Sequence, residues 1–207
     1  MLFRSGSWAI IHAEGGIERG RYWSLRDEAA RPRFRGLDTR IATDELEALL
    51  TDAVRTQMVA DVPVGALLSG DVESAAVAAL TQAAAGEQKM RTFTIGFSAR
   101  ANDGAAAAGA VAHHLGTEHT QTMIAPEDAM SLAPYLSDIY DEPFADPSQI
   151  PALLTSRLTR QGVTVALSGD GGDEGFAGHP RYDALPQWQK LSSIPLGIRS
   201  LAARAVH

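Results

Sequence analysis

Residues 62–68 form an apolar run of strand length that passes directly into Ser69-Gly70, and a helix-compatible pattern starts at Val72. A strand, a turn of small residues and a helix in this order aim free backbone N–H groups and a positive helix end at an anion, most often phosphate. Such a turn alone is weak evidence, because small residues follow strands in many α/β proteins for steric reasons.

A second apolar run, residues 163–167, leads into Ser-Gly-Asp-Gly-Gly-Asp-Glu at 168–174. Two strands that each end in Leu-Ser-Gly would place two turns at the carboxyl edge of one parallel sheet, where open α/β sheets bind ligands. The first turn offers amides for a phosphate, and the second offers carboxylates for a metal ion. Together they predict a nucleotide site.

The segments between these turns alternate between strand and helix patterns. Helices are expected from the N-cap Thr43 to about Val59, from Val72 in an alanine-rich stretch, over 105–115, from Pro126 with a break at Pro134, and over 149–160; strands are expected at 62–68, 91–97, 118–124 and 163–167. This alternation predicts a doubly wound parallel α/β sheet with helices on both faces.

The two ends of the chain are less regular. Short β-like pieces at 8–12 and 21–25 flank a glycine-rich turn, and residues 29–38 look like a solvated connection. We interpret residues 1–42 as a remnant or linker and residues 43–207 as one domain. From Ala177 the pattern weakens, with a short helix expected around 198–206.

Composition excludes several classes of function. The chain has no cysteine, which excludes disulfides, thiolate metal sites and a cysteine nucleophile. A net charge of −7 argues against a nucleic-acid partner. No apolar run approaches the roughly 20 residues that span a bilayer, so no membrane partner is expected and the cytoplasm is the default compartment.

Several stretches resemble one family. Leu-Leu-Ser-Gly-Asp-Val-Glu-Ser at 67–74 is similar to the pyrophosphate loop, Ser-Gly-Gly-x-Asp-Ser, of the N-type ATP pyrophosphatases. The synthetase domain of glutamine-dependent asparagine synthetases matches further, through Ala-Asp-Val-Pro-Val-Gly, Thr-Phe-Thr-Ile-Gly-Phe, His-Leu-Gly-Thr-Glu-His, Tyr-Asp-Glu-Pro-Phe-Ala-Asp and Val-Ala-Leu-Ser-Gly-Asp-Gly-Gly-Asp-Glu. The resemblance covers about residues 45–182, in the family's order.

The resemblance implies an adenine nucleotide alpha hydrolase-like fold and an ATP-dependent ligase. ATP would adenylate the side-chain carboxylate of aspartate, and ammonia would then give asparagine, AMP and pyrophosphate. The small-molecule partners would be ATP, an aspartate-like carboxylate and ammonia. Carried over residue by residue, the ATP and pyrophosphate contacts fall on Leu68, Ser69, Gly70, Asp71, Ser74, Ile95, Ser168 and Gly169.

The resemblance also assigns narrower roles. Leu68 and Ile95 would border the adenine through backbone groups, and Asp170 stands at the acidic position linked to adenylate formation. Mg²⁺ is expected between Glu73 and Asp173.

This sequence departs from the family at defined positions. Asp71 replaces the second loop glycine and adds a negative charge, and Glu73 is one methylene longer than the family's aspartate. The family's glutaminase cysteine is missing, so ammonia would come from solution or from a separate glutaminase. The family continues past Tyr182 into a helical region with a catalytic lysine that Lys190 does not match, which indicates a domain truncated at its C-terminal helical region.

Two alternatives remain open beside the asparagine synthetase-like reaction. One is a degenerate, non-catalytic remnant that binds nucleotide weakly. The other is a related synthetase that acts on another carboxylate, as in β-lactam ring closure or the amidation of sugars and peptides. The residues His113, His114 and His119 fit structural roles better than a metal cluster. For Asp141, Glu142 and Asp146, a substrate-side role is matched about equally by helix capping and loop hydrogen bonding.

Overall fold

The structure is a computed structural model that describes residues 4–31, 38–98, 104–142 and 145–196. The chain divides into two compact units, Met1–Leu46 and Glu47–His207. The second unit contains the parallel sheet and both glycine-containing turns.

The first unit contains an antiparallel hairpin of β1 (Ser7–Ile11) and β2 (Ile17–Arg21), in which Ser7 pairs with Arg21. The prediction for the first strand is confirmed, but the second was placed at 21–25 and is wrong. Gly15 and Gly16 both have positive φ, so the turn is tight and the second strand begins directly after them. The predicted connection at 29–38 overlaps helix α1 (Leu25–Ala30), and residues 32–37 lie outside the described part.

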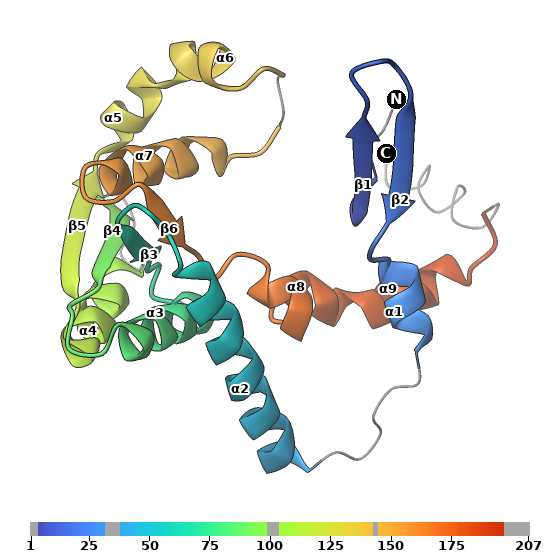
Figure 1. The fold of residues 1–207 in the computed structure, drawn as a ribbon, viewed down its shortest axis with the longest axis horizontal. Helices are drawn as coiled ribbons and strands as arrows, with labels where there is room; N and C mark the ends of the chain where they lie inside the picture. Colours follow the sequence, from blue (N-terminus) through green and yellow to red (C-terminus); the bar gives the residue numbers. More distant parts are fainter. Residues whose placement is uncertain (1–3, 32–37, 99–103, 143–144, 197–207) are drawn as a thin grey trace. The chain divides into compact units, whose positions relative to one another are not determined.

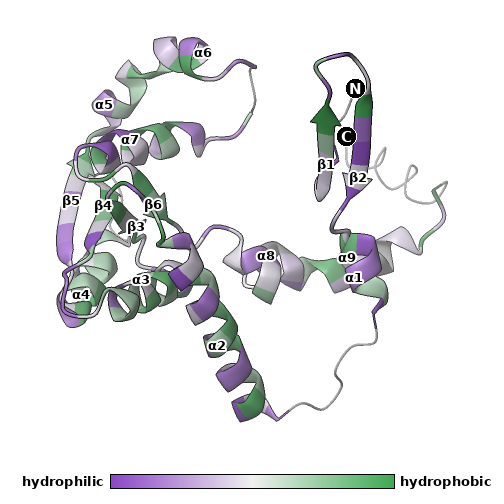
Figure 2. Cartoon of the chain, in the orientation of Figure 1, coloured by the Kyte–Doolittle hydropathy of each residue, from purple (hydrophilic) through white to green (hydrophobic). Residues whose placement is uncertain are grey.

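Helix α2 (Thr39–Gln57) begins before the predicted N-cap Thr43. Asp38 accepts a hydrogen bond from the backbone N–H of Arg40 at 2.8 Å, while the Thr43 hydroxyl donates to the carbonyl of Thr39. The helical spacing of Leu46, Leu49, Leu50, Ala53 and Val54 predicts an apolar stripe that belongs to the core. This prediction is wrong for most of the stripe, because Val54 is the only buried residue of α2. Figure 2 shows apolar and polar residues alternating around α2.

The second unit is built on four parallel strands in the order β5-β4-β3-β6. Their bounds are β3 (Val64–Leu67), β4 (Arg91–Phe97), β5 (Glu118–Ile124) and β6 (Val165–Leu167). The chain adds β4 and β5 on one side of β3 and then returns to place β6 on the other side (Figure 1). The order therefore reverses between β3 and β6, which is the point where such sheets bind ligands.

Helices cover both faces of this sheet. Helices α3 (Val72–Ala85) and α4 (Ala105–Leu115) pack on one face, and α7 (Gln149–Arg160) packs on the other (Figure 1). Between β5 and α7 the chain forms α5 (Pro126–Ser131), the 3₁₀ turn η1 (Ala133–Tyr135) and α6 (Leu136–Ile139). The predicted doubly wound parallel α/β fold is confirmed, as is the break at Pro134.

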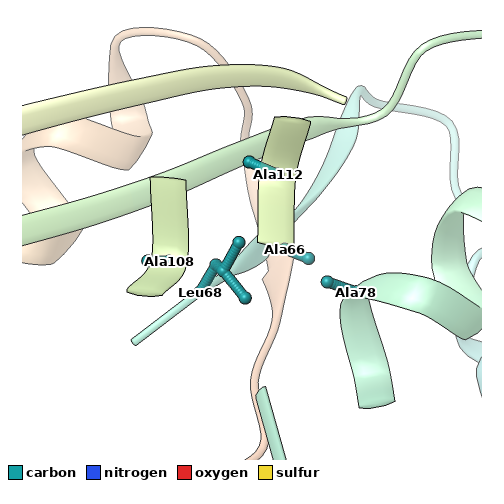
Figure 3. Close-up of a cluster of buried hydrophobic side chains, with 5 residues drawn as sticks. All are labelled: Ala66, Leu68, Ala78, Ala108 and Ala112. Carbon is teal, nitrogen blue, oxygen red and sulfur yellow. The ribbon is translucent and has the colours of Figure 1, made fainter. Parts of the chain in front are cut away.

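The core under α3 and α4 consists largely of alanine. Ala66 lies in β3 and Leu68 directly follows it, Ala78 comes from α3, and Ala108 and Ala112 come from α4 (Figure 3). Since alanine carries no atoms beyond Cβ, both helices can lie close to the strands. The buried Thr94 hydroxyl donates to the carbonyl of Leu68 and so fixes the end of β3 against β4.

After β6 the chain forms α8 (Gly172–Phe176), the 3₁₀ helix η2 (Pro180–Ala184) and α9 (Leu185–Ser192). None of these was predicted: α8 has only five residues, two of them glycine, and the periodic pattern fades after Ala177. The helix expected around 198–206 lies outside the described residues. Within the described residues, every helix is too short or too polar to cross a bilayer.

Candidate functional site

A cavity of about 750 Å³ opens at the carboxyl ends of β3, β4 and β6, where the strand order reverses. We call residues 68–74 the phosphate loop and residues 168–174 the acidic loop. Of the residues predicted for the site, Gly70 does not line this cavity. The ten that do are Leu68, Ser69, Asp71, Glu73, Ser74, Ile95, Ser168, Gly169, Asp170 and Asp173.

The start of the phosphate loop is fixed by its neighbours. The backbone N–H of Leu68 donates to the carbonyl of Phe93 at 2.9 Å, which continues the pairing with β4. Gly70 has φ +93°, and a Cβ there would overlap the carbonyl oxygen of Gly104 at the start of α4. Only glycine suits this position, because it needs both positive φ and close backbone contact. Gly70 therefore shapes the loop from behind the cavity.

Asp71 occupies the N-cap of α3. Its Oδ1 accepts from the backbone N–H of Ser74 at 2.7 Å, and its Oδ2 accepts from the Ser69 hydroxyl. Partial burial raises the pKa of Asp71, but the hydrogen bonds from Ser69 and Ser74 outweigh it and hold the pKa below the usual value. Asp71 is therefore a carboxylate anion at neutral pH.

The phosphate loop is also bonded internally by its two serines. The Ser69 N–H donates to Ser74 Oγ at 3.1 Å, and the Ser74 hydroxyl donates to the Asp71 carbonyl at 3.3 Å. The two serine Oγ atoms are 2.9 Å apart. The donors of Ser69 and Ser74 that were predicted to hold pyrophosphate are thus engaged within the loop itself.

The acidic loop lies against the phosphate loop. A Cβ at Gly169 would lie 2.6 Å from the Ser74 backbone nitrogen, and one at Gly172 would overlap Glu73 Cγ. Within the acidic loop, the Ser168 hydroxyl donates to Asp170 Oδ2 at 3.1 Å. The predicted proximity of the two turns is confirmed, while the chemical roles of their residues remain predictions.

Glu73 and Asp173 converge on one small volume beside Gly178. A Cβ at Gly178 would overlap Asp173 Oδ1 and would lie 3.4 Å from Glu73 Oε1. No ion pair reaches either carboxylate within the described residues. Those residues contain no group of three or more metal-ligating side chains, but Mg²⁺ commonly takes one or two carboxylates together with substrate phosphates. The pair fits that mode of binding.

The charge on the cavity wall has one sign. Its lining includes the carboxylates of Asp71, Glu73, Asp170, Asp173 and Glu174, and no lysine or arginine is among the described lining residues. A bare polyphosphate would meet repulsion from this wall. A cation that accompanies the phosphates would reduce it.

Sequence reasoning missed the wall that α7 contributes. Pro151, Ala152, Thr155 and Ser156 line the cavity. Their spacing of four residues marks one helix face, but the pattern does not tell which face meets a cavity. The sequence pattern predicts that Ile150, Leu153, Leu154 and Leu158 bury this helix. They are only partly buried, whereas Thr159 is buried.

The alternating β4 residues Phe93, Ile95 and Phe97 supply an apolar wall of the same cavity. Of these, the prediction named only Ile95. Thr94, on the opposite face of the strand, also reaches the lining beside the phosphate loop.

The acidic residues before α7 have different surroundings. Asp146 accepts hydrogen bonds from the N–H of Ser148 at 2.8 Å and from its hydroxyl at 2.7 Å, and these bonds lower the pKa of Asp146. These contacts favour loop hydrogen bonding for Asp146, since α7 has Ser148 as its N-cap residue and no side-chain cap hydrogen bond. Neither Asp141 nor Glu142 lines the cavity.

The three histidines do not form a cluster in the described structure. His113 and His114 are exposed on α4, and His119 Nδ1 lies 2.9 Å from Thr92 Oγ1 on β4. His119 therefore has a structural partner inside the second unit.

The sequence around this cavity is similar to known proteins of one family. The family model for asparagine synthase matches residues 45–207, which include the whole sheet and both loops. A protein of Methanocaldococcus jannaschii described as a putative glutamine-hydrolyzing asparagine synthetase is 38% identical over 91% of this chain and 35% of its own length.

Two further relatives carry related descriptions. Glutamine-hydrolyzing asparagine synthetase 1 of Bacillus subtilis is 32% identical over 76% of this chain and 24% of its own length. Asparagine synthetase B of Escherichia coli is 28% identical over 72% of this chain and 29% of its own length. The chain thus spans about a quarter to a third of these relatives. Because the family match covers well over half of the chain and takes in every strand of the parallel sheet, the chain belongs to the asparagine synthase family.

Proposed function

We propose that the cavity binds ATP with Mg²⁺ and adenylates the side-chain carboxylate of aspartate, which ammonia then converts to an amide. The observation that carries the proposal is the contact between the two serine-glycine loops at the reversal of strand order. Matched relatives are described as asparagine synthetases, which supports the choice of reaction.

The two sides of the cavity suit the two halves of a nucleotide. Phe93, Ile95 and Phe97 offer an apolar wall to the adenine, near Leu68. Ser69, Ser74, Ser168 and Gly169 lie where the phosphates would pass. Between these walls the triphosphate would extend from β4 toward the acidic loop.

Glu73 and Asp173 would hold Mg²⁺, and its positive charge would offset the negative charge of the phosphates. This chain's residues bring the reactants together and exclude water. An aspartate carboxylate oxygen attacks the α-phosphorus, and the bond to pyrophosphate breaks. Ammonia then attacks the acyl carbon, AMP leaves, and a proton is released. Asp170, held by Ser168, supports adenylate formation.

Ammonia would be supplied from solution or by a separate glutaminase, since the chain contains no cysteine for glutamine hydrolysis. Omission of ammonium should therefore prevent asparagine formation even when glutamine is present.

The test is release of pyrophosphate in the presence of ATP, Mg²⁺, aspartate and ammonium. The unaltered chain should release it at least tenfold faster than Ser69→Ala. Ser131→Ala removes an exposed hydroxyl at the end of α5 and should behave as the unaltered chain. A rate equal to that of Ser69→Ala would refute the proposal.

A second candidate is a nucleotide-binding protein without turnover. It is favoured by Asp71, whose carboxylate engages the donors that a phosphate needs. Calorimetry separates the two functions: MgATP binding without pyrophosphate release would support this candidate.

A third candidate keeps the reaction and changes the acceptor. The α7 wall brings hydroxyls, among them Thr155 and Ser156, to the cavity, and these can bond many carboxylate substrates. Pyrophosphate release with glutamate or a peptide carboxylate in place of aspartate would support this candidate.

A further inference from the structure

The Asp71 carboxylate accepts hydrogen bonds from donors of its own loop. One carboxylate oxygen accepts a hydrogen bond from the Ser74 N–H, in the first turn of the 14-residue helix α3. The other accepts a hydrogen bond from the Ser69 hydroxyl. A backbone N–H at a helix N-terminus and an adjacent hydroxyl are the donors that a phosphate oxygen ordinarily uses. The carboxylate thus occupies the position of a bound anion.

A phosphate that enters this position must first displace the carboxylate. The short side chain of Asp71 cannot carry its charge far away, and the cavity offers Glu73, Asp170, Asp173 and Glu174 but no described lysine or arginine. A bare phosphate would therefore exchange one set of hydrogen bonds for another and add repulsion.

A polyphosphate that brings a divalent cation meets a different situation. Carboxylate oxygens are preferred ligands of Mg²⁺, so the displaced carboxylate gains a new partner when the phosphate takes its donors. The free-energy cost of displacing the Asp71 carboxylate is therefore offset only when the polyphosphate arrives with its divalent cation.

This reasoning rests on the proposed nucleotide function and goes one step further. We propose that Asp71 is a specificity-determining residue: its carboxylate occupies the phosphate position of the loop, excludes metal-free phosphates and admits polyphosphates that carry a divalent cation.

The experiment is calorimetric titration with inorganic pyrophosphate, once with chelator and once with Mg²⁺. Asp71→Ser keeps a capping hydroxyl but empties the anion position, and Asp71→Asn keeps the cap and removes only the charge. Glu87→Gln removes a charge just beyond the other end of α3 and serves as the matched control. Thermal unfolding checks that each variant is folded.

Without metal, Asp71→Ser should bind pyrophosphate at least tenfold more tightly than the unaltered chain, with Asp71→Asn between them and Glu87→Gln unchanged. With Mg²⁺ the difference should shrink to threefold or less. Equal metal-free affinity in the unaltered chain and both folded variants would overturn the inference.

A parallel titration with MgATP separates the two possible failures. If the unaltered chain binds MgATP while the Asp71 variants gain no metal-free affinity, the specificity role of Asp71 is wrong and the nucleotide site stands. If the folded chain and all variants bind neither MgATP nor pyrophosphate, the proposed function fails and the inference falls with it.

Discussion

Gly169 and Gly172 hold the two loops of the cavity together by having no side chains. At Gly169 the obstacle to a Cβ is the backbone of α3, at Ser74 and Glu73, whereas at Gly172 it is the flexible Glu73 side chain. Backbone atoms of a packed helix cannot move cheaply, but a side chain can rotate. The same small substitution should therefore have different consequences at the two sites.

Gly169→Ala should lower the free energy of unfolding by about 1–3 kcal/mol, the usual cost of overpacking. Gly172→Ala should lower it by less, since Glu73 can turn away. Gly175→Ala is the control, because no atom lies within 4 Å of its Cβ position. Urea unfolding measures all three. Equal stability of Gly169→Ala and Gly175→Ala would show that the loops are not in contact.

His119 gives the stability a dependence on pH. Burial lowers the pKa of His119 below 6.5, and its Nε2 is buried without a partner in the described residues. The unfolded chain therefore binds a proton more readily than the folded one, and the free energy of unfolding should fall as the pH drops below about 6.5. Above that pH this contribution vanishes.

His119→Gln should weaken this fall in stability, measured by urea unfolding at several pH values between about 5 and 8. His113→Gln, at an exposed position of α4, should keep it. If His119→Gln retains the full dependence of the unaltered chain, His119 is not its source.

At the scale of elements, the alanine layer fixes how closely α4 can approach β3. Ala108 and Ala112 are buried against Ala66 and Leu68, whereas Ala106 on the same helix is exposed. Close packing of this kind tolerates little added volume. It also sets the distance between the start of α4 and Gly70.

Ala108→Leu should therefore lower the free energy of unfolding by about 1–3 kcal/mol. Ala106→Leu adds the same atoms at an exposed site and should stay within about 0.5 kcal/mol of the unaltered chain. Comparison of the two urea midpoints is the measurement. A destabilisation of the same size in both would assign the effect to helix propensity rather than to packing.

The long periodic elements were predictable from sequence, and the short ones were not. The bounds of β4, β5, α4 and α7 match the predictions, because each has a sustained apolar pattern with clear ends. The five-residue α8 has no period to detect, and its glycines indicate loop rather than helix. Gly172 of α8 packs against Glu73 of α3, and the local sequence does not reveal this tertiary contact.

At the scale of the whole molecule, the cavity shows which site residues sequence can reveal. Both loops were found because each follows a strand and carries a motif in sequence. The α7 wall was missed, since Ala152 and Thr155 have no motif and reach the cavity only through the packing of α7 on β4. For Gly70 the structure shows a close approach to Gly104 that the sequence did not predict, while its contact with a ligand remains a prediction.

Ala152→Phe should fill the space between α7 and the loops. Ala152 is exposed to the cavity, so stability should change little while MgATP affinity falls at least tenfold. Arg157→Phe, also on α7 but away from the cavity lining, is the control for surface aromatics. Unchanged affinity in Ala152→Phe would place the ligand elsewhere.

The most direct measurement is equilibrium binding of MgATP to the unaltered chain and to Ser69→Ala, Ser168→Ala and the double variant. If the triphosphate lies between the two loops, binding should be saturable at one site, each single variant should weaken it, and the double variant should weaken it further. An affinity that neither serine affects would contradict a nucleotide site between these loops.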